Sequence, residues 1–178
     1  SLKKSDSKNN NKLYQSDFDR LLLETGNGSF ERLKNQKNYR IGVNYMDTDF
    51  KKLIQEAKKI AYKKTLSEYA VCGQVGCALL TKKGNIYTGI CIDANCALGN
   101  CAEYAAIAEM LKNSESEIDK IVAYSAKGKI YAPCGRCREL IRMINNLNLE
   151  TKIMVDEDKI YKLKDLLPEM YITKNTMA

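Results

Sequence analysis

The chain has 178 residues, of which 44% are hydrophobic, and it carries a formal net charge of +7. A chain of this length predicts one domain of ordinary size with a full buried core, and no apolar run is long enough to suggest a membrane partner. Histidine is absent, which excludes Ser-His-Asp and Cys-His catalysis and leaves cysteine, aspartate and glutamate as metal ligands.

The first 46 residues differ in character from the rest of the chain. Residues 1–12 are mostly Lys, Ser, Asn and Asp, a composition typical of disorder, and Ser16 is a candidate cap for a short helix that Gly26 would end. We therefore predict a partly disordered N-terminal extension at 1–46 and a folded domain at 47–178.

The pattern of apolar residues after position 46 predicts alternating helices and strands. The predicted elements are a helix that begins at 47–49, strands at 74–80 and 86–92, a loop at 93–100, a helix from Cys101, a strand at 118–125, a helix whose first turn contains Pro133, strands at 152–155 and 159–162, and a closing turn at 163–168. This order predicts an α/β fold in which helices cover a sheet.

Three cysteines lie where two of these helices begin. Cys134 and Cys137 have the two-residue spacing of a zinc knuckle, and Cys101 supplies a third sulfur from a distant part of the chain. Three protein ligands leave one tetrahedral position open, as in a catalytic zinc site. Glu103 follows two residues after Cys101, so it is placed to meet whatever occupies the open position. The sequence therefore predicts a Zn²⁺ site with a neighbouring acid.

The Cys-Ala-Glu triplet at 101–103 and the Pro-Cys-Gly-Arg-Cys-Arg run at 133–138 resemble the cytidine deaminase family, whose signature pairs x-Glu with Pro-Cys-x-x-Cys. The resemblance extends over residues 50–171. It implies a three-layer α/β/α fold with a mixed sheet of about five strands. It also implies hydrolysis of cytidine or deoxycytidine to uridine or deoxyuridine and ammonia, a reaction of pyrimidine salvage.

The resemblance implies roles for individual residues. Glu103 is expected to act first as general base and then as general acid. The backbone N–H of Ala102 is expected to contact the pyrimidine O2, and the carbonyl of Ala132 to hold the amine. Members with three cysteine ligands commonly form homotetramers in which neighbours complete each site, so we expect the same assembly here.

The chain departs from the family pattern around the sugar and the base. Members usually carry Asn-x-Glu after the second strand to hold a ribose hydroxyl, and the corresponding run here is Cys91-Ile92-Asp93. Asp93 can replace the Glu with a shorter reach, whereas Cys91 is a poor replacement for Asn. An aromatic residue that lies beside the base in many members corresponds to Gly73. These differences leave the exact aminopyrimidine nucleoside open.

A further departure is Tyr104, which stands where an Arg often follows the catalytic Glu, and Arg136 or Arg138 is a candidate to compensate. Blasticidin S deaminase, a related enzyme that inactivates an antibiotic, also lacks that Arg and shares the run at 133–138. Deamination of blasticidin S is therefore the alternative reaction, and a non-catalytic, zinc-stabilised binding protein is an alternative of another class.

Other interpretations of single residues stay open at this point. The three cysteines can join Cys91 or Cys96 in a closed structural site, and Glu103 can serve as a first-turn acid that interacts with the helix dipole. Seven cysteines are an odd number whose spacing favours metal ligation over disulfides, so we expect a cytoplasmic protein. The lysines are scattered and no dense basic and aromatic patch occurs, so we expect no nucleic-acid partner.

Overall fold

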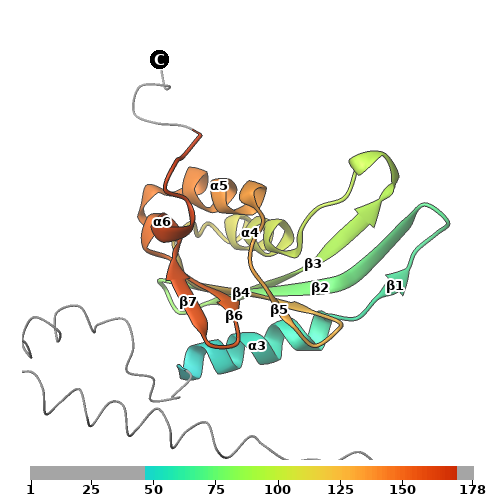
Figure 1. The fold of residues 1–178 in the computed structure, drawn as a ribbon, viewed down its shortest axis with the longest axis horizontal. Helices are drawn as coiled ribbons and strands as arrows, with labels where there is room; N and C mark the ends of the chain where they lie inside the picture. Colours follow the sequence, from blue (N-terminus) through green and yellow to red (C-terminus); the bar gives the residue numbers. More distant parts are fainter. Residues whose placement is uncertain (1–46, 172–178) are drawn as a thin grey trace, which may run out of the picture. The chain divides into compact units, whose positions relative to one another are not determined.

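The computed structural model describes residues 47–171, so the predicted extension at 1–46 and its short helix lie outside the described residues. Within the described range a mixed sheet of seven strands is covered by α-helices on both faces (Figure 1). The predicted three-layer α/β/α class is confirmed. No helix between residues 47 and 171 is long and apolar enough to cross a membrane.

The predicted elements occur in the predicted order, and two further two-residue strands, Lys64–Thr65 and Ile130–Tyr131, were not predicted. The elements are α3 (Thr48–Ile60), β1 (Lys64–Thr65), β2 (Ala70–Thr81), β3 (Ile86–Ala94), α4 (Ala102–Lys112), β4 (Ile118–Ser125), β5 (Ile130–Tyr131), α5 (Gly135–Ile144), β6 (Lys152–Asp156), β7 (Lys159–Lys162) and α6 (Leu163–Leu166), with short 3₁₀ turns at Asn95–Ala97 and Asn146–Glu150.

The seven strands occupy five positions across the sheet. The long strands run in the order β3, β2, β4, β6 and β7, and only β4 and β6 are parallel. The two-residue strands β1 and β5 add no width. β1 pairs with β2 on the edge that β4 also uses, and β5 pairs with β4 on the edge that β6 also uses. The expected width of about five strands therefore agrees with the topology.

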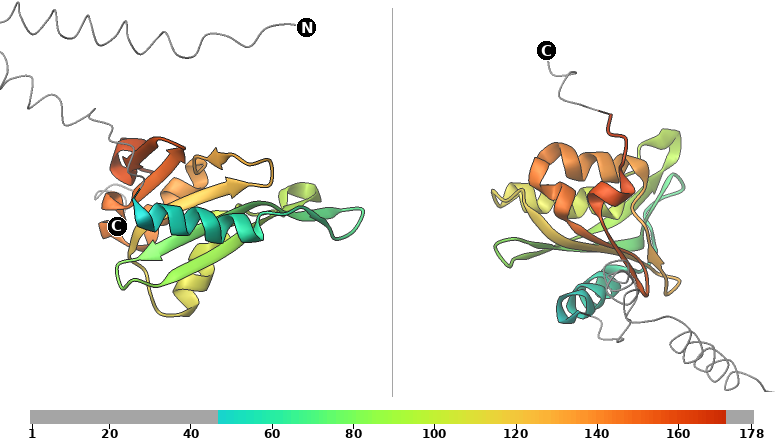
Figure 2. Two further views of the ribbon diagram at one scale, coloured as in Figure 1. Left: turned by 90° about the horizontal axis from the view of Figure 1, so that it is seen from below. Right: turned by 60° about the vertical axis from the view of Figure 1, so that its left-hand side comes forward.

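Among the helices of residues 47–171, α3 alone covers one face of the sheet (Figure 2). Its first turn is closed by Asp47, whose carboxylate accepts a hydrogen bond from the Asp49 N–H at 3.0 Å. Its apolar stripe packs on residues from three strands. The buried side chains of this layer are Phe50, Leu53, Ala57, Ala78, Val122 and Met154. This layer supports the sheet from the side opposite the cysteines.

Helices α4 and α5 cover the other face, and α4 lies very close to β3. A Cβ on Gly89 of β3 would stand 2.2 Å from the Ala106 nitrogen and 2.6 Å from the Ala102 oxygen, so only glycine fits. The alanines of α4 allow the same approach from the helix side. This contact fixes the height of the α4 N-terminus above the sheet.

The bounds of some elements differ from the prediction. Strand β2 begins at Ala70 and β3 continues to Ala94, so Asp93 belongs to a strand and not to the predicted loop, because the two strands pair as far as Ala70 and Ala94. Pro133 precedes α5 instead of forming its first turn, since Cys134 is the extended N-cap with a ψ of 167°. The predicted closing turn contains the short helix α6.

Asn148 joins the segments that hold α5 against the sheet. This side chain is 1% exposed and its Oδ1 accepts from the Ile118 N–H at 2.8 Å. Its Nδ2 donates to the carbonyls of Ser116 at 3.0 Å and Ile141 at 2.9 Å. One buried amide therefore ties the start of β4 to the C-terminal half of α5.

We predict that Asn148→Ala lowers the free energy of unfolding by about 2–4 kcal/mol, because the Ile118 N–H and the carbonyls of Ser116 and Ile141 would lose their hydrogen-bond partner. Asn113→Ala is the matched control, since the Asn113 amide bonds the Glu109 carbonyl at an exposed site, and it should cost less than about 1 kcal/mol. Urea denaturation of both variants measures the difference. Equal losses would contradict the role given to Asn148.

Candidate functional site

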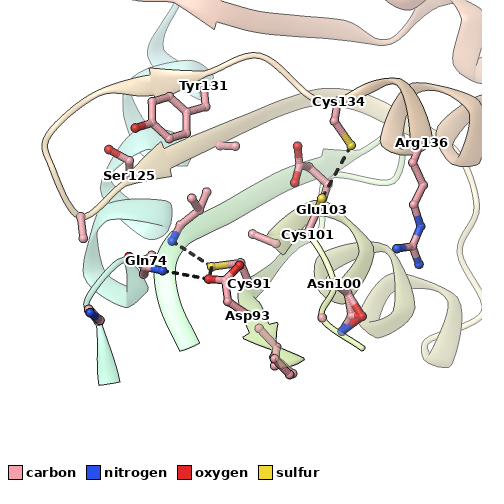
Figure 3. A pocket seen from close by; sticks show the side chains of 18 of the residues that line it. Gln74, Cys91, Asp93, Asn100, Cys101, Glu103, Ser125, Tyr131, Cys134 and Arg136 are labelled. Atoms are coloured by element: carbon pink, nitrogen blue, oxygen red, sulfur yellow. Dashed lines mark hydrogen bonds between the residues drawn. The ribbon is translucent and has the colours of Figure 1, made fainter. Parts of the chain in front are cut away.

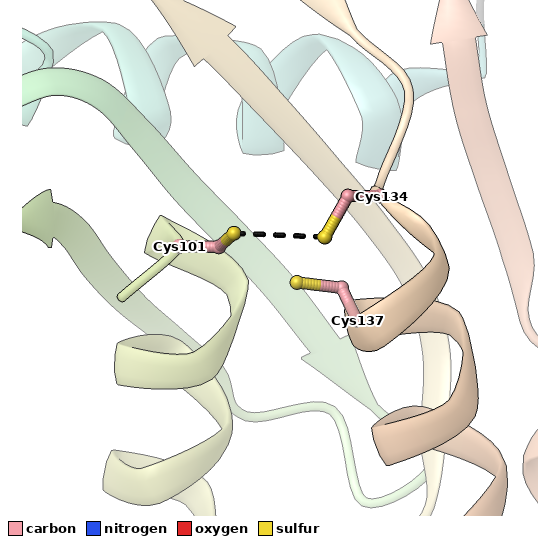
Figure 4. A group of neighbouring side chains, drawn as sticks. All are labelled: Cys101, Cys134 and Cys137. Carbon is pink, nitrogen blue, oxygen red and sulfur yellow. Dashed lines mark hydrogen bonds between the residues drawn. The ribbon is translucent and has the colours of Figure 1, made fainter. Parts of the chain in front are cut away.

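The N-termini of α4 and α5 bring three sulfurs together. Cys101 is the N-cap of α4, Cys134 is the N-cap of α5, and Cys137 lies in the first turn of α5. Their Sγ atoms all lie within 4.8 Å of one another (Figure 4). The Sγ atoms of Cys101 and Cys134 are 3.6 Å apart. The three thiols predicted to share a metal are thus close enough to do so.

The spacing of the sulfurs fits a tetrahedral zinc ion. Zinc–sulfur bonds of about 2.3 Å at tetrahedral angles place two sulfurs about 3.8 Å apart. Among residues 47–171 this is the one group of three or more cysteine or acidic side chains with such an arrangement. Cys91 and Cys96, which a closed four-cysteine site would need, are outside it. The donor set leaves room for a fourth, non-protein ligand.

The electrostatics of the thiols also suit a cation. Burial raises the pKa of the Cys137 thiol far above its ordinary value, and the neighbouring Glu103 charge adds to this effect. Burial likewise raises the pKa of Cys101. Burial raises the pKa of Cys134 too, but hydrogen bonds from Cys137 and Cys101 outweigh it and hold that pKa below its ordinary value. A soft divalent ion would supply the positive charge that ionised thiols need here.

Glu103 is a buried acid beside the thiols. Its side chain is 6% exposed and it projects from the first turn of α4. Burial raises the pKa of its carboxyl, and hydrogen bonds from its own backbone N–H and from Cys137 only partly oppose this effect. A carboxyl whose pKa is raised exchanges protons more readily near neutral pH. The first-turn position predicted for Glu103 is observed, although the side chain is turned inward.

One cavity of about 820 Å³ gathers most of the predicted site residues (Figure 3). The predicted residues that line it are Cys91, Asp93, Cys101, Ala102, Glu103, Ala132 and Cys134. Cys137 is not among its lining residues. This volume lies within the range of about 300–1,000 Å³ typical of small-molecule sites. The cavity can therefore hold a molecule of nucleoside size against the thiols.

The carboxylate of Asp93 is oriented by Gln74, a residue of β2 that sequence analysis did not single out. Gln74 Nε2 donates to Asp93 Oδ2 at 2.9 Å. The Cys91 sulfur accepts from the Val75 N–H at 3.2 Å and lies 3.8 Å from the same Asp93 oxygen (Figure 3). Gln74 thus engages one of the two carboxylate oxygens. Gln74 lies 19 residues before Asp93 in the chain, so no local sequence pattern indicates that the two side chains bond to each other.

The backbone at Gly73, the residue expected to correspond to an aromatic side chain of the family, requires glycine. Its φ is +76°, and a Cβ would lie 2.1 Å from the carbonyl oxygen of Tyr62. The register of β2 against β3 shifts between Cys72 and Gly76, which marks a bulge. The connection after α3 therefore comes close to β2 at one end of the cavity.

The two candidate arginines point to different places. The Arg136 guanidinium lies 5.5 Å from the centre of the Tyr104 ring, and Arg136 lines the cavity. Arg138 instead donates to the carbonyls of Pro133 at 2.9 Å and Leu166 at 3.0 Å. Arg138 thereby fastens the segment before Cys134 to the end of α6.

The C-terminal segment continues along α5 beyond this contact. Arg142 Nε lies 3.3 Å from the Met170 sulfur, and the Tyr171 N–H donates to a Glu139 oxygen at 2.8 Å. Together with Arg138, which contacts Leu166, the side chains of Glu139 and Arg142 bind residues 166–171 to α5. The helix that carries two of the three thiols is held on this side by the last described residues of the chain.

Comparison with known proteins links this site to a family. Residues 47–149 match the family model described as the cytidine and deoxycytidylate deaminase zinc-binding region. The chain is also 38% identical to the blasticidin-S deaminase of Bacillus cereus over 76 residues, which are 38% of this chain and 54% of that relative. It thus spans about half the length of this curated relative.

Solved structures agree with the family match. The cytidine deaminase of Mycobacterium tuberculosis has a TM-score of 0.58 and 26% identity, and the match covers 71% of this chain and all of that one. The cytidine deaminase of Burkholderia pseudomallei has a TM-score of 0.52 and 26% identity, with 71% and 99% covered. The family match spans more than half of the 178 residues. The resemblance stated from the sequence is therefore confirmed, and the chain belongs to the zinc-binding cytidine and deoxycytidylate deaminase family of hydrolases.

Proposed function

We propose that the protein hydrolyses cytidine or deoxycytidine to uridine or deoxyuridine and ammonia. The observation that carries this proposal is a cluster of three thiols at the edge of one cavity, which is lined by two of them together with a buried acid, Glu103, and the carboxylate of Asp93. Hydrolytic deamination needs these parts, because water must be activated, protons must move to the ring and the amine, and the substrate must be held in place.

We propose Cys101, Cys134 and Cys137 as the ligands of one Zn²⁺ ion. Their sulfur spacing and the absence of histidine from the chain support this set. Zinc in such a site lowers the pKa of water to about 7 and so supplies a nucleophile at neutral pH. The N-termini of α4 and α5 carry partial positive charge, which favours the ionised form of the thiols they present.

Glu103 is the proposed proton carrier. Its carboxylate takes one proton from the attacking water and delivers it to ring N3. It then takes the second proton from the hydroxyl that this water leaves on C4 and gives it to the leaving amine, so that C4 becomes a carbonyl as the C–N bond breaks. The Ala102 N–H lies in the first turn of α4, where helix N–H groups have no partner within the helix, so it is available to the pyrimidine O2. The Ala132 carbonyl is the proposed acceptor for the amine. Both residues line the cavity.

Asp93 is the proposed contact for the sugar, with Cys91 beside it. A carboxylate has only acceptors, so it suits a hydroxyl donor, and Gln74 occupies one of its oxygens. Cys91 is 7% exposed and its sulfur accepts a backbone N–H, so its proposed part is to form the wall of the cavity next to Asp93.

A second candidate substrate is blasticidin S, which the identity of 38% with a blasticidin-S deaminase favours. Absorbance assays on cytidine, deoxycytidine and blasticidin S, together with zinc analysis, separate the candidates. One zinc per chain with turnover of cytidine supports the first proposal. Turnover of blasticidin S alone supports the second. Zinc without turnover of any aminopyrimidine would favour a non-catalytic binding protein.

We further propose a cytoplasmic homotetramer that serves pyrimidine salvage. Apolar side chains on the outside of the described chain support an assembly, since Leu66, Tyr69 and Leu98 are 59%, 61% and 78% exposed. Leu66 and Tyr69 lie in the turn between β1 and β2, and Leu98 follows β3, whose end pairs with the start of β2.

We predict that Glu103→Gln retains one zinc per chain and the fold but loses about 10²–10⁴-fold in kcat, because an amide cannot carry the proton. Glu109→Gln on the same helix is the control, since Glu109 only accepts the Thr88 N–H there. Metal analysis, circular dichroism and the cytidine assay give the result. Wild-type turnover by Glu103→Gln would refute the role.

We predict that Asp93→Ala lowers kcat/KM for cytidine roughly ten- to a hundred-fold, because a lost hydrogen bond to a charged group costs about 1.5–3 kcal/mol. The loss should be much smaller with 2′,3′-dideoxycytidine, which lacks the two hydroxyls. The ratio of kcat/KM for the two substrates is the quantity to measure. Equal losses on both would show that Asp93 does not contact the sugar hydroxyls.

A further inference from the structure

An aromatic side chain that the proposed reaction does not use lines the cavity. Among residues 47–171, Tyr131 is the single aromatic residue of that lining. It is 42% exposed, so a large part of its ring is open to a molecule that enters the cavity. Its hydroxyl forms no hydrogen bond with the part of the chain that the structure describes. The contacts within residues 47–171 therefore leave both the ring and the hydroxyl of Tyr131 available.

The register between β4 and β5 turns this ring toward the cavity. Tyr131 pairs with Ala123, and Ile130 pairs with Tyr124. Successive residues of a strand point to opposite faces of the sheet. Ile130 and Tyr124 pack against the layer under α3, whereas Ala123 lines the cavity. Tyr131 therefore belongs to the cavity side of the sheet, and Ala123, its neighbour across the strands, is too small to cover the ring.

The backbone on both sides of β5 is anchored. Before the strand, the Ser125 N–H donates to the Lys129 carbonyl at 2.7 Å and closes the turn from β4. After the strand, the Pro133 carbonyl accepts from Arg138 Nε at 2.9 Å. A side chain on a segment held at both ends is a better binding surface than one on a loose loop, because less conformational freedom is lost on binding.

The position of Tyr131 in the cavity matches the place proposed for the base. It directly precedes Ala132, whose carbonyl is the proposed acceptor for the amine. Figure 3 shows Tyr131 between Ser125 and Cys134 along one side of the cavity, with Asp93 on the other side. A pyrimidine whose amine meets Ala132 and whose sugar meets Asp93 is therefore within reach of the ring.

The bulge of β2 leaves a need for such a ring. Gly73, the residue expected to correspond to an aromatic side chain of the family, has a φ of +76°, and a Cβ there would lie 2.1 Å from the Tyr62 carbonyl oxygen. No side chain fits at that position. A flat pyrimidine still gains from an aromatic neighbour, because it buries its faces against the ring and leaves its edges to hydrogen bonds.

We propose that Tyr131 contacts the substrate and determines specificity, because its ring packs against the pyrimidine base in place of an aromatic side chain at Gly73. This inference rests on the proposed deamination and adds a residue to it. It predicts that the site prefers a flat base to a saturated, puckered base with the same polar groups on its edge.

Calorimetry with the product uridine and with 5,6-dihydrouridine, whose saturated base is not flat, measures this preference on the full zinc-loaded chain without turnover. We expect the wild type to bind uridine roughly tenfold tighter than 5,6-dihydrouridine. Tyr131→Ala should bind uridine roughly ten- to a hundred-fold more weakly and should bind the two nucleosides within about threefold of each other. Tyr131→Phe retains the ring and should retain the preference.

Ile160→Ala is the matched control, because Ile160 is also a large apolar side chain on a short strand, is 44% exposed and does not line the cavity. It should bind both nucleosides like the wild type, and thermal unfolding checks the fold of every variant. A folded Tyr131→Ala that keeps the wild-type preference would overturn the inference. Loss of the preference in Tyr131→Phe would also overturn it, because the hydroxyl and not the ring would then be the contact.

Fluorescence gives a second readout, because the chain contains no tryptophan. Tyr131→Trp introduces a single indole, and a base that stacks on it should quench its emission in a saturable way. Uridine should quench it more than 5,6-dihydrouridine does, and Ile160→Trp should show no quenching at the same concentrations. A Tyr131→Trp variant that binds uridine by calorimetry without any change in emission would contradict the proposed contact.

These measurements separate the inference from the proposed reaction. A chain that prefers uridine through Tyr131 but deaminates no aminopyrimidine would support the inference and refute the reaction. Turnover of cytidine together with a preference that does not depend on Tyr131 would do the reverse. A wild type that binds uridine no tighter than 5,6-dihydrouridine would overturn the inference whatever its turnover.

Discussion

The close approach of two helix N-termini above one face of the sheet is the constraint on which the site depends. Three thiols converge only because α4 and α5 both begin there, and the 3.6 Å between the sulfurs of Cys101 and Cys134 leaves little tolerance. Gly89 sets the height of α4 by letting its backbone touch β3. Asn148 and the residues that contact Arg138 set the position of α5. Packing far from the thiols therefore determines their geometry.

The position of the thiols at two helix N-termini also reduces the repulsion between the acidic groups of the site. Three ionised thiols and a buried carboxylate would repel one another in a low-dielectric site. Burial is the largest cause of the raised pKa of Cys137, and the neighbouring charges of Glu103 and Cys101 raise it further. Two helix dipoles point their positive ends at these groups, and a dication would complete the balance. The chain has no histidine, and the three thiols and Glu103 are all groups that become negative when they ionise. Glu103 stays buried beside them because α4 presents it from its first turn.

Much of the fold and of the metal site could be predicted from local patterns. The Asp47 cap, the apolar stripe of α3 and the cysteine spacing are signals carried by residues close in sequence. The register of β2 is different, because the bulge at Gly73 depends on how Tyr62 and β3 pack against it. The pairing of Gln74 with Asp93 likewise joins two strands. Sequence reasoning missed what tertiary contacts decide.

The contacts between α5 and residues 166–171 determine when, during synthesis of the chain, the three thiols reach their final geometry. All three thiols have left the ribosome's catalytic centre when residue 137 is made, but the side chains that hold α5 in place find their partners only after Asn148, Leu166 and Tyr171 have followed. Until then the growing chain presents reactive thiols without a defined geometry. Capture of the proposed Zn²⁺ ion should therefore be a late step, completed after residue 171 has been made, and a nascent chain that stalls before residue 166 would expose those thiols to oxidation.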